Sequence, residues 1–202
     1  MAKAEPVRCF GAGSQIYRDY HDREWGRPVV DEIRLLEKLC LEGFQAGLSW
    51  LTILRKRDAF RDAFAGFDPE QLARFGKRDI ERLMRDTRIV RNRAKIEAAI
   101  ANGRAALALR EDGLPLVELV WSYRGKRRHR PRTLADLPAT TPEATHLSRE
   151  LKRRGFRFVG PTTVYATMQA CGVVNDHLGR CFVRAEVERE QQAVASRLGL
   201  WG

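Results

Sequence analysis

Residues 31–50 read DEIRLLEKLCLEGFQAGLSW, and this stretch decides the fold. The apolar residues of its first half recur every three or four positions, which is typical of a helix with one buried face, and Asp31 is a favourable N-cap. Gly43 and Gly47 interrupt this pattern, and Ser49 begins a second helical period that continues to residue 64. The stretch therefore predicts two helices joined by a corner that contains two glycines.

Helical periods also dominate the rest of the chain. Two capping residues, Asp68 and Thr141, each precede a proline that would occupy the first helical position. Strand-like alternation is weak throughout, and the triplet at 157–159 is too short to count as a strand. The pattern predicts an all-α protein made of short helices and short loops. Further helices are expected at residues 69–75, 77–84, 92–109, 142–154, 161–171 and 185–198.

The composition narrows the class of protein. The chain has 202 residues, with 30 Arg and 7 Lys against 26 acidic residues, and a net charge of +11. Its hydrophobic content of 44% excludes a disordered basic tail. No apolar run could span a bilayer and no signal peptide is visible, so we expect a cytoplasmic protein without a membrane partner. The arginine excess favours a polyanionic partner, although a codon preference for arginine would produce the same composition.

Possible metal ligands occur near both ends of the chain. Cys9 and His21 lie near the N-terminus, and His177 and Cys181 lie near the C-terminus. A His-x3-Cys pair is a common half of a tetrahedral zinc site, but each pair taken alone is more often incidental. A disulfide between Cys9 and Cys181 is the alternative, which a reducing cytoplasm disfavours.

A second candidate site is the corner between the first two predicted helices. Glu42 ends the apolar helix there, between bulky side chains and close to Gly43 and Gly47. A carboxylate in such surroundings is costly unless it accepts hydrogen bonds, and an aromatic pocket of Tyr20 and Trp50 with Glu42 as its polar group would suit an extruded nucleobase. An ordinary surface glutamate at a helical corner is the simpler alternative.

Four blocks of the sequence, taken together, identify a family. They read YHDREWG (20–26), LEGFQAGLSW (41–50), LKRRGFRFVG (151–160) and MQACGVVNDH (168–177). In this order they resemble the 3-methyladenine DNA glycosylase I family, over about residues 8–181, and four ordered blocks are far more specific than one motif. The resemblance implies a two-lobed helix–hairpin–helix fold as a domain at 1–183, which leaves 184–202 as a C-terminal helical tail.

The resemblance also assigns the metal ligands. It implies that one zinc ion joins the two ends of the chain through Cys9, His21, His177 and Cys181. Four protein ligands leave no position open for water, so this zinc is expected to be structural rather than catalytic.

The hairpin of the family corresponds to residues 83–96 of this chain. Arg91, Arg93 and Lys95 are expected to contact DNA phosphates there. The family usually has glycine where Thr87 or Arg88 stands, and a non-glycine residue at positive φ would be strained. The basic stretch at 124–132 has no assigned role.

The activity implied by the resemblance is hydrolysis of the N-glycosidic bond of 3-methyladenine in double-stranded DNA, by base flipping and without strand cleavage. It implies that Glu42 binds the adenine edge, that Tyr20 and Trp50 stack on the base, and that Tyr17 lines the pocket. Phe10 is a further candidate for the pocket wall. The remaining DNA contact is expected at the corner, where Gly47 precedes Leu48, our candidate wedge. A monomer is expected.

Two other classes of protein remain to be tested. A zinc-containing helical protein that binds damaged DNA without catalysis would share the metal ligands and the positive charge. It would not need Glu42 to recognise a base. A helix-turn-helix regulator would need a recognition helix with polar, base-contacting residues, and no clear candidate for one is present.

Overall fold

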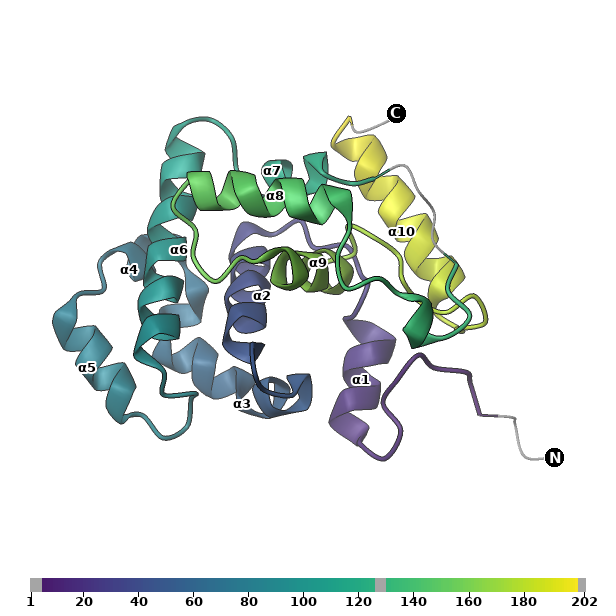
Figure 1. Cartoon of the computed structure of the whole chain (residues 1–202), viewed down its shortest axis with the longest axis horizontal. Helices are drawn as coiled ribbons and strands as arrows, with labels where there is room; N and C mark the ends of the chain where they lie inside the picture. Colours follow the sequence, from purple (N-terminus) through teal and green to yellow (C-terminus); the bar gives the residue numbers. More distant parts are fainter. Residues whose placement is uncertain (1–4, 126–129, 200–202) are drawn as a thin grey trace.

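The computed structural model describes residues 5–125 and 130–199, and every regular element within them is a helix, which confirms the all-α prediction (Figure 1). None of these helices is long and apolar enough to cross a membrane. In chain order the elements are α1 (Gln15–Arg23), α2 (Glu32–Gln45), α3 (Trp50–Ala63), the 3-10 turn η1 (Ala65–Phe67), α4 (Pro69–Ala73), α5 (Lys77–Arg85), α6 (Arg93–Glu111), α7 (Leu116–Ser122), η2 (Leu134–Asp136), α8 (Pro142–Arg153), α9 (Pro161–Ala170) and α10 (Arg184–Arg197).

The helix starts agree closely with the expected caps. The side chains of Asp31, Ser49, Asp68, Asn92 and Thr141 each accept a hydrogen bond from a backbone N–H of the first turn. These bonds satisfy donors that the helix itself leaves unpaired. Two helices were not expected, α1 and α7, and neither has a side-chain cap.

Helix α2 is the centre of the fold. Nine of its fourteen residues are buried, and α3, α6, α7 and α9 pack against it. In Figure 1, α4 to α6 lie on one side of α2, and α1 and α10 lie on the other. Two of the buried residues of α2 are the carboxylic acids Glu37 and Glu42. A helix that is buried on most of its faces brings any polar side chain it carries into an apolar environment.

The expected hairpin is formed by α5, residues 86–92 and α6. Among the described residues, the non-glycine residues with positive φ are Ala65, Phe67 and Phe158, so Thr87 and Arg88 do not need a glycine-like conformation. Instead, Asp86 accepts a hydrogen bond from the Arg88 N–H, and Lys56 donates to the carbonyls of Thr87 and Arg88. The strain anticipated from the missing glycine is therefore absent.

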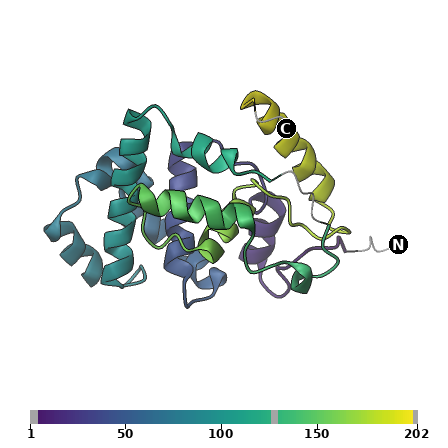
Figure 2. The same cartoon turned by 45° about the horizontal axis from the view of Figure 1, so that its top comes forward.

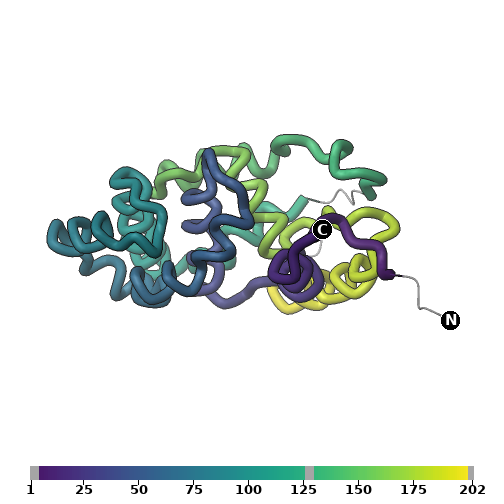
Figure 3. The backbone as a smooth tube through the Cα atoms, turned by 90° about the horizontal axis from the view of Figure 1, so that it is seen from below, coloured from purple at the N-terminus to yellow at the C-terminus, as the bar shows by residue number. Residues whose placement is uncertain are grey.

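The N-terminal segment and the start of α10 lie together at one end of the molecule (Figure 1). Figures 2 and 3 both place the N-terminal segment beside the segment that leads into α10. The Phe182 N–H donates to the Val7 carbonyl, and Arg27 forms ion pairs with Glu186 and Glu190 of α10. Helix α10 therefore packs against the rest of the chain rather than standing apart from it.

Candidate functional site

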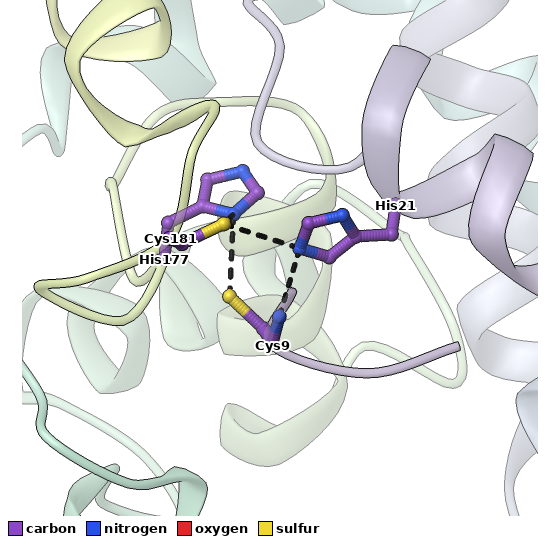
Figure 4. A group of neighbouring side chains, drawn as sticks. All are labelled: Cys9, His21, His177 and Cys181. Atoms are coloured by element: carbon purple, nitrogen blue, oxygen red, sulfur yellow. Dashed lines mark hydrogen bonds between the residues drawn. The ribbon is translucent and has the colours of Figure 1, made fainter. Parts of the chain in front are cut away.

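Four side chains from the two ends of the chain meet in one cluster, which we call the metal cluster: Cys9, His21, His177 and Cys181 (Figure 4). Their ligand atoms all lie within 4.8 Å of one another. Cys9 Sγ is 3.4 Å from His177 Nδ1, and Cys181 Sγ is 3.4 Å from His21 Nε2 and 3.5 Å from His177 Nδ1. In a tetrahedral zinc site, sulfur and nitrogen ligands would be about 3.6 Å apart. The donor set and its spacing therefore fit a tetrahedral metal ion.

The surroundings of the cluster orient its ligands. His21 contacts Asp22 through Nδ1 at 2.8 Å, which leaves Nε2 for the cluster, and Asp22 is itself held by Arg8. His177 contacts the Trp25 carbonyl through Nε2 at 3.0 Å, which leaves Nδ1 for the cluster. Outer partners of this kind fix the tautomer and direction of metal-binding histidines.

The cysteines of the cluster are thiols suited to a metal. All four cysteines of the chain are free, so the alternative of a Cys9–Cys181 disulfide is not adopted. The hydrogen bond between the two thiols holds the pKa of Cys181 well below its usual range against the effect of burial, and the same bond raises the pKa of Cys9, so the pair favours one thiolate. A thiolate is the form of cysteine that binds metals.

Helix α1 connects the metal cluster with a second site. Tyr20 and His21 follow Tyr17 by three and four residues, so both lie on the same side of the helix as Tyr17. His21 is fully buried in the metal cluster, while the Tyr20 ring lies 5.3 Å from the Trp50 ring at the start of α3. This spacing is the signal that would have revealed α1 as a helix.

The second site is built around a buried carboxylate. Glu42 is 7% exposed, and within residues 5–125 and 130–199 no hydrogen bond or ion pair to its side chain is formed. Burial raises the pKa of Glu42 to about 8, and the charge of Lys38 opposes this only in part. Burial and then the charge of Glu42 raise the pKa of Tyr17 and of Tyr20, so both phenols lie within its electrostatic reach.

The two tyrosines near this carboxylate belong to a larger group of aromatic rings. The Phe10 ring is 4.8 Å from the Tyr17 ring and 6.3 Å from the Tyr20 ring, which extends the pair of Tyr20 and Trp50. The indole N–H of Trp50 is buried and has no hydrogen-bond partner among residues 5–125 and 130–199. We call Phe10, Tyr17, Tyr20, Trp50 and Glu42 the carboxylate site. Apolar ring faces around one polar group are a favourable arrangement for a flat heteroaromatic ligand.

The sequence analysis did not predict that Lys38 lies at the carboxylate site. Lys38 precedes Glu42 by four residues on α2, and its ammonium lies 5.3 Å from the centre of the Tyr20 ring. It is the cation that counteracts the rise in the pKa of Glu42. The i, i+4 spacing of the two residues is visible in the sequence and could have indicated this contact.

The residues expected to contact DNA lie at the corner and at the hairpin, and they differ in how exposed they are. Leu48 is 42% exposed beside Gly47, whose φ is +80°, and Arg91 and Arg93 are exposed at the hairpin. Lys95 differs, because its ammonium is buried and donates to the carbonyls of Phe44 and Ala46. In the structure this lysine ties the hairpin to the corner, and its expected phosphate contact stays a prediction.

The basic stretch at 124–132 lies partly outside the described residues. Residues 126–129 belong to that undescribed part, while the backbone N–H of Arg132 donates to Asp136. Nothing in the described part assigns the stretch a role.

All the comparisons with known proteins match one family. The family model described as methyladenine glycosylase matches residues 10–184, which ends at the first residue of α10. DNA-3-methyladenine glycosylase 1 of Escherichia coli strain K12 is 47% identical over 171 residues, covering 82% of this chain and 90% of that protein.

Solved structures agree with this match. A crystal structure of 3-methyladenine DNA glycosylase I superimposes with a TM-score of 0.84 at 45% identity, covering 87% of this chain and 98% of the other. The 3-methyladenine DNA glycosylase I from Staphylococcus aureus, whose structure concerns 3-methyladenine recognition, superimposes with a TM-score of 0.83 at 36% identity. That superposition covers 87% of this chain and 95% of the Staphylococcus aureus chain.

Proposed function

Since the chain belongs to the methyladenine glycosylase family, whose members hydrolyse N-glycosyl bonds, we propose that it excises 3-methyladenine from double-stranded DNA. The base would be flipped out of the duplex, and hydrolysis would leave an abasic site. The observation that carries this proposal is Glu42, a buried carboxylate without a protein partner among the described residues, which lies near two tyrosines of an aromatic cluster.

The chemistry of the substrate suits such a site. Adenine alkylated at N3 is cationic while it is attached to the sugar, so it is already a good leaving group. An enzyme can therefore act by binding the extruded base and stabilising the oxocarbenium-like sugar, without a strong acid. Glu42 would accept hydrogen bonds from the adenine edge and provide the opposite charge. Tyr20 and Trp50 would stack on the base, with Tyr17 and Phe10 along the wall.

The protonation state of Glu42 would couple binding of the base to release of a proton. With a pKa of about 8 the carboxyl group is mostly protonated at neutral pH in the free protein. A cationic base beside it would favour the carboxylate, because an opposite charge lowers the pKa of an acid. Binding of the cationic base should therefore release a proton from Glu42 near pH 7.

The remaining contacts would hold the duplex. Leu48, beside Gly47, would fill the gap left by the flipped nucleotide, and Arg91 and Arg93 would contact phosphates without reading the sequence. Strand cleavage through a Schiff base needs a free amine as nucleophile. The ammonium of Lys95 is held by two carbonyls, and that of Lys38, beside the carboxylate site, lies 4.0 Å from Glu24 Oε2, which supports a monofunctional enzyme.

For the metal cluster we propose one structural zinc ion. Two sulfur and two nitrogen ligands are typical of structural zinc, and four protein ligands would leave no place for a reacting water. The metal would hold together chain ends that are separated by most of the sequence. We take residues 1–183 as the catalytic unit, acting as a monomer, and 184–202 as a helical tail whose helix α10 packs on that unit.

The activity can be tested directly. The purified protein is incubated with methylated duplex DNA, and the released bases are separated by chromatography. We expect release of 3-methyladenine and the appearance of abasic sites without strand breaks. Tight binding to alkylated or abasic DNA without release of any base would instead support the competing class, a damage-binding protein without catalysis.

A further inference from the structure

The loop between α8 and α9 presents an exposed aromatic side chain in an unfavourable backbone conformation. Phe158 has a φ of +54°, in the left-handed region that residues with a side chain seldom adopt, and its side chain is 41% exposed. Phe67 also has a positive φ, but it is fully buried in the main core. Packing in the core therefore accounts for the conformation of Phe67 and leaves that of Phe158 without such a reason.

Buried side chains hold the loop on both sides of Phe158. Asn102 of α6 is buried, and its amide accepts a hydrogen bond from the Arg157 N–H at 2.7 Å and donates to the Arg157 carbonyl at 3.1 Å. Ser148 of α8 is also buried and donates to the Val159 carbonyl at 2.6 Å. Strained conformations that the surrounding structure enforces in this way are concentrated at functional sites.

The same face of α6 also holds the corner that carries Leu48. Lys95 bonds the carbonyls of Phe44 and Ala46, and Asn102 follows it by seven residues, or two helical turns. The two anchoring points are thus about 10 Å apart along α6. Phe158 lies against the end of α2 as well, since a Cβ built on Gly43 would be 3.3 Å from the Phe158 Cβ.

Three features therefore project from one scaffold next to the carboxylate site. They are the hairpin with its exposed arginines, the corner with the exposed Leu48, and the loop with the exposed Phe158 and Arg157. An apolar ring with an arginine beside it is a suitable group for entering the minor groove, where apolar side chains separate base steps and cations meet phosphates.

We propose that Phe158 is a second side chain that inserts into damaged duplex DNA, next to the gap at which Leu48 is expected. This inference rests on the proposed function, because it takes a duplex with a flipped nucleotide as the partner. The ring would stack on a base exposed by the flip, and the rigid loop would keep it in position before binding. Phe158 is thus a DNA-contacting residue that positions the duplex, and it does not contact the excised base.

The test compares two binding reactions of one variant. Phe158→Asn removes the ring, and asparagine tolerates the left-handed conformation, so the loop should stay folded and the melting temperature should not fall. We expect roughly tenfold weaker binding to a duplex that contains an abasic-site analogue, because a stacked base is lost. Binding of free 3-methyladenine should be unchanged. Phe158→Tyr, which keeps the ring, should bind the duplex like the wild type.

A matched control comes from the other end of α2. Ile33 is 39% exposed in the first turn of α2, far from Gly43, and Ile33→Asn should leave both binding reactions unchanged. Equal affinity of folded Phe158→Asn and of the wild type for the abasic duplex would overturn the proposal. An equal loss for the duplex and for the free base would also overturn it, because the ring would then support the carboxylate site instead.

Failure of this inference is separable from failure of the proposed function. Binding to an abasic duplex requires no catalysis, so the comparison of variants stands even for a protein that releases no base. Release of 3-methyladenine by the wild type, measured in the same preparation, tests the proposed function alone.

Discussion

The metal cluster and the carboxylate site both contain buried polar side chains, but they differ in how those side chains are satisfied. In the metal cluster the ring nitrogens of His21 and His177 that point away from the cluster contact Asp22 and the Trp25 carbonyl. At the carboxylate site, Glu42 has no such partner within the described part of the chain. A group satisfied within the protein contributes to folding, whereas a buried group without a partner costs stability until a ligand supplies one.

The same contrast recurs within a single helix. Glu37 and Glu42 are both buried on α2. Glu37 is bound by Arg61, whose Nε and Nη2 lie 2.9 Å and 2.8 Å from Glu37 Oε1. Five residues further on, nothing comparable contacts Glu42 among the described residues. Burial alone therefore does not identify a binding site, and the absence of a partner is the more informative observation.

The largest effect is expected where the metal cluster is broken. Cys181→Ser should reduce bound zinc and lower the free energy of unfolding by about 5 kcal/mol or more, since structural zinc supplies roughly 10–16 kcal/mol in zinc-finger peptides. Elemental analysis and thermal melting of the same sample measure the two together.

A matched variant at a second buried thiol controls for core packing. Cys40 lies in the main core outside the cluster, so Cys40→Ser should reduce stability without reducing metal content. A wild-type protein purified without any bound metal would end the zinc proposal.

The next largest effect is an increase in the free energy of unfolding, expected when the charge of Glu42 is removed. The pKa of Glu42 is about 8 in the folded protein and near 4.5 when unfolded. The folded state therefore binds more protons between these values, and stability falls as the pH rises from 4.5 to 8. Glu42→Gln removes this penalty, so it should stabilise the protein by roughly 3–5 kcal/mol at pH 8.5 and by little at pH 4.5. Urea unfolding at several pH values measures the difference.

The partnered acid of α2 serves as the control for this titration. Glu37→Gln weakens the contact with Arg61, so it should destabilise the protein by about 1–3 kcal/mol at pH 8.5. A stabilisation of similar size from both substitutions would show that the two acids of α2 do not differ as the comparison requires.

A smaller effect is expected at the hairpin, away from both buried sites. Charge reversal of Arg91 and Arg93 should weaken duplex binding for all sequences and reduce the slope of log affinity against log salt by about one for each lost phosphate contact. Arg110 lies at the other end of α6 and pairs with Glu70, so its reversal controls for net charge. If neither charge reversal at the hairpin changes the slope of log affinity against log salt, the phosphate contacts lie elsewhere.

The sequence predicted the helices with strong caps better than the sites they carry. Asp31 and Ser49 lie at helix starts because capping is local, and local chemistry is visible in a sequence. Helix α1 has no side-chain cap and few apolar residues, so only the spacing of Tyr17, Tyr20 and His21 could have indicated it.

Other features depend on contacts between distant parts of the chain. Lys95 reads as one more basic residue in a basic segment, and only the fold brings it to the carbonyls of Phe44 and Ala46. Phe158 belongs to a recognised block, but its backbone conformation depends on Asn102 and Ser148 from other helices. No local pattern contains such information.

The most direct test of the account is single-turnover release of 3-methyladenine from methylated duplex DNA by Glu42→Gln. Glutamine keeps the size of the side chain and removes the charge that would face the cationic base. We expect the release rate to fall roughly 100-fold, consistent with the loss of a buried charged contact, while binding to an abasic duplex stays the same. An unchanged release rate in this folded variant would contradict the role of Glu42 in recognising the base.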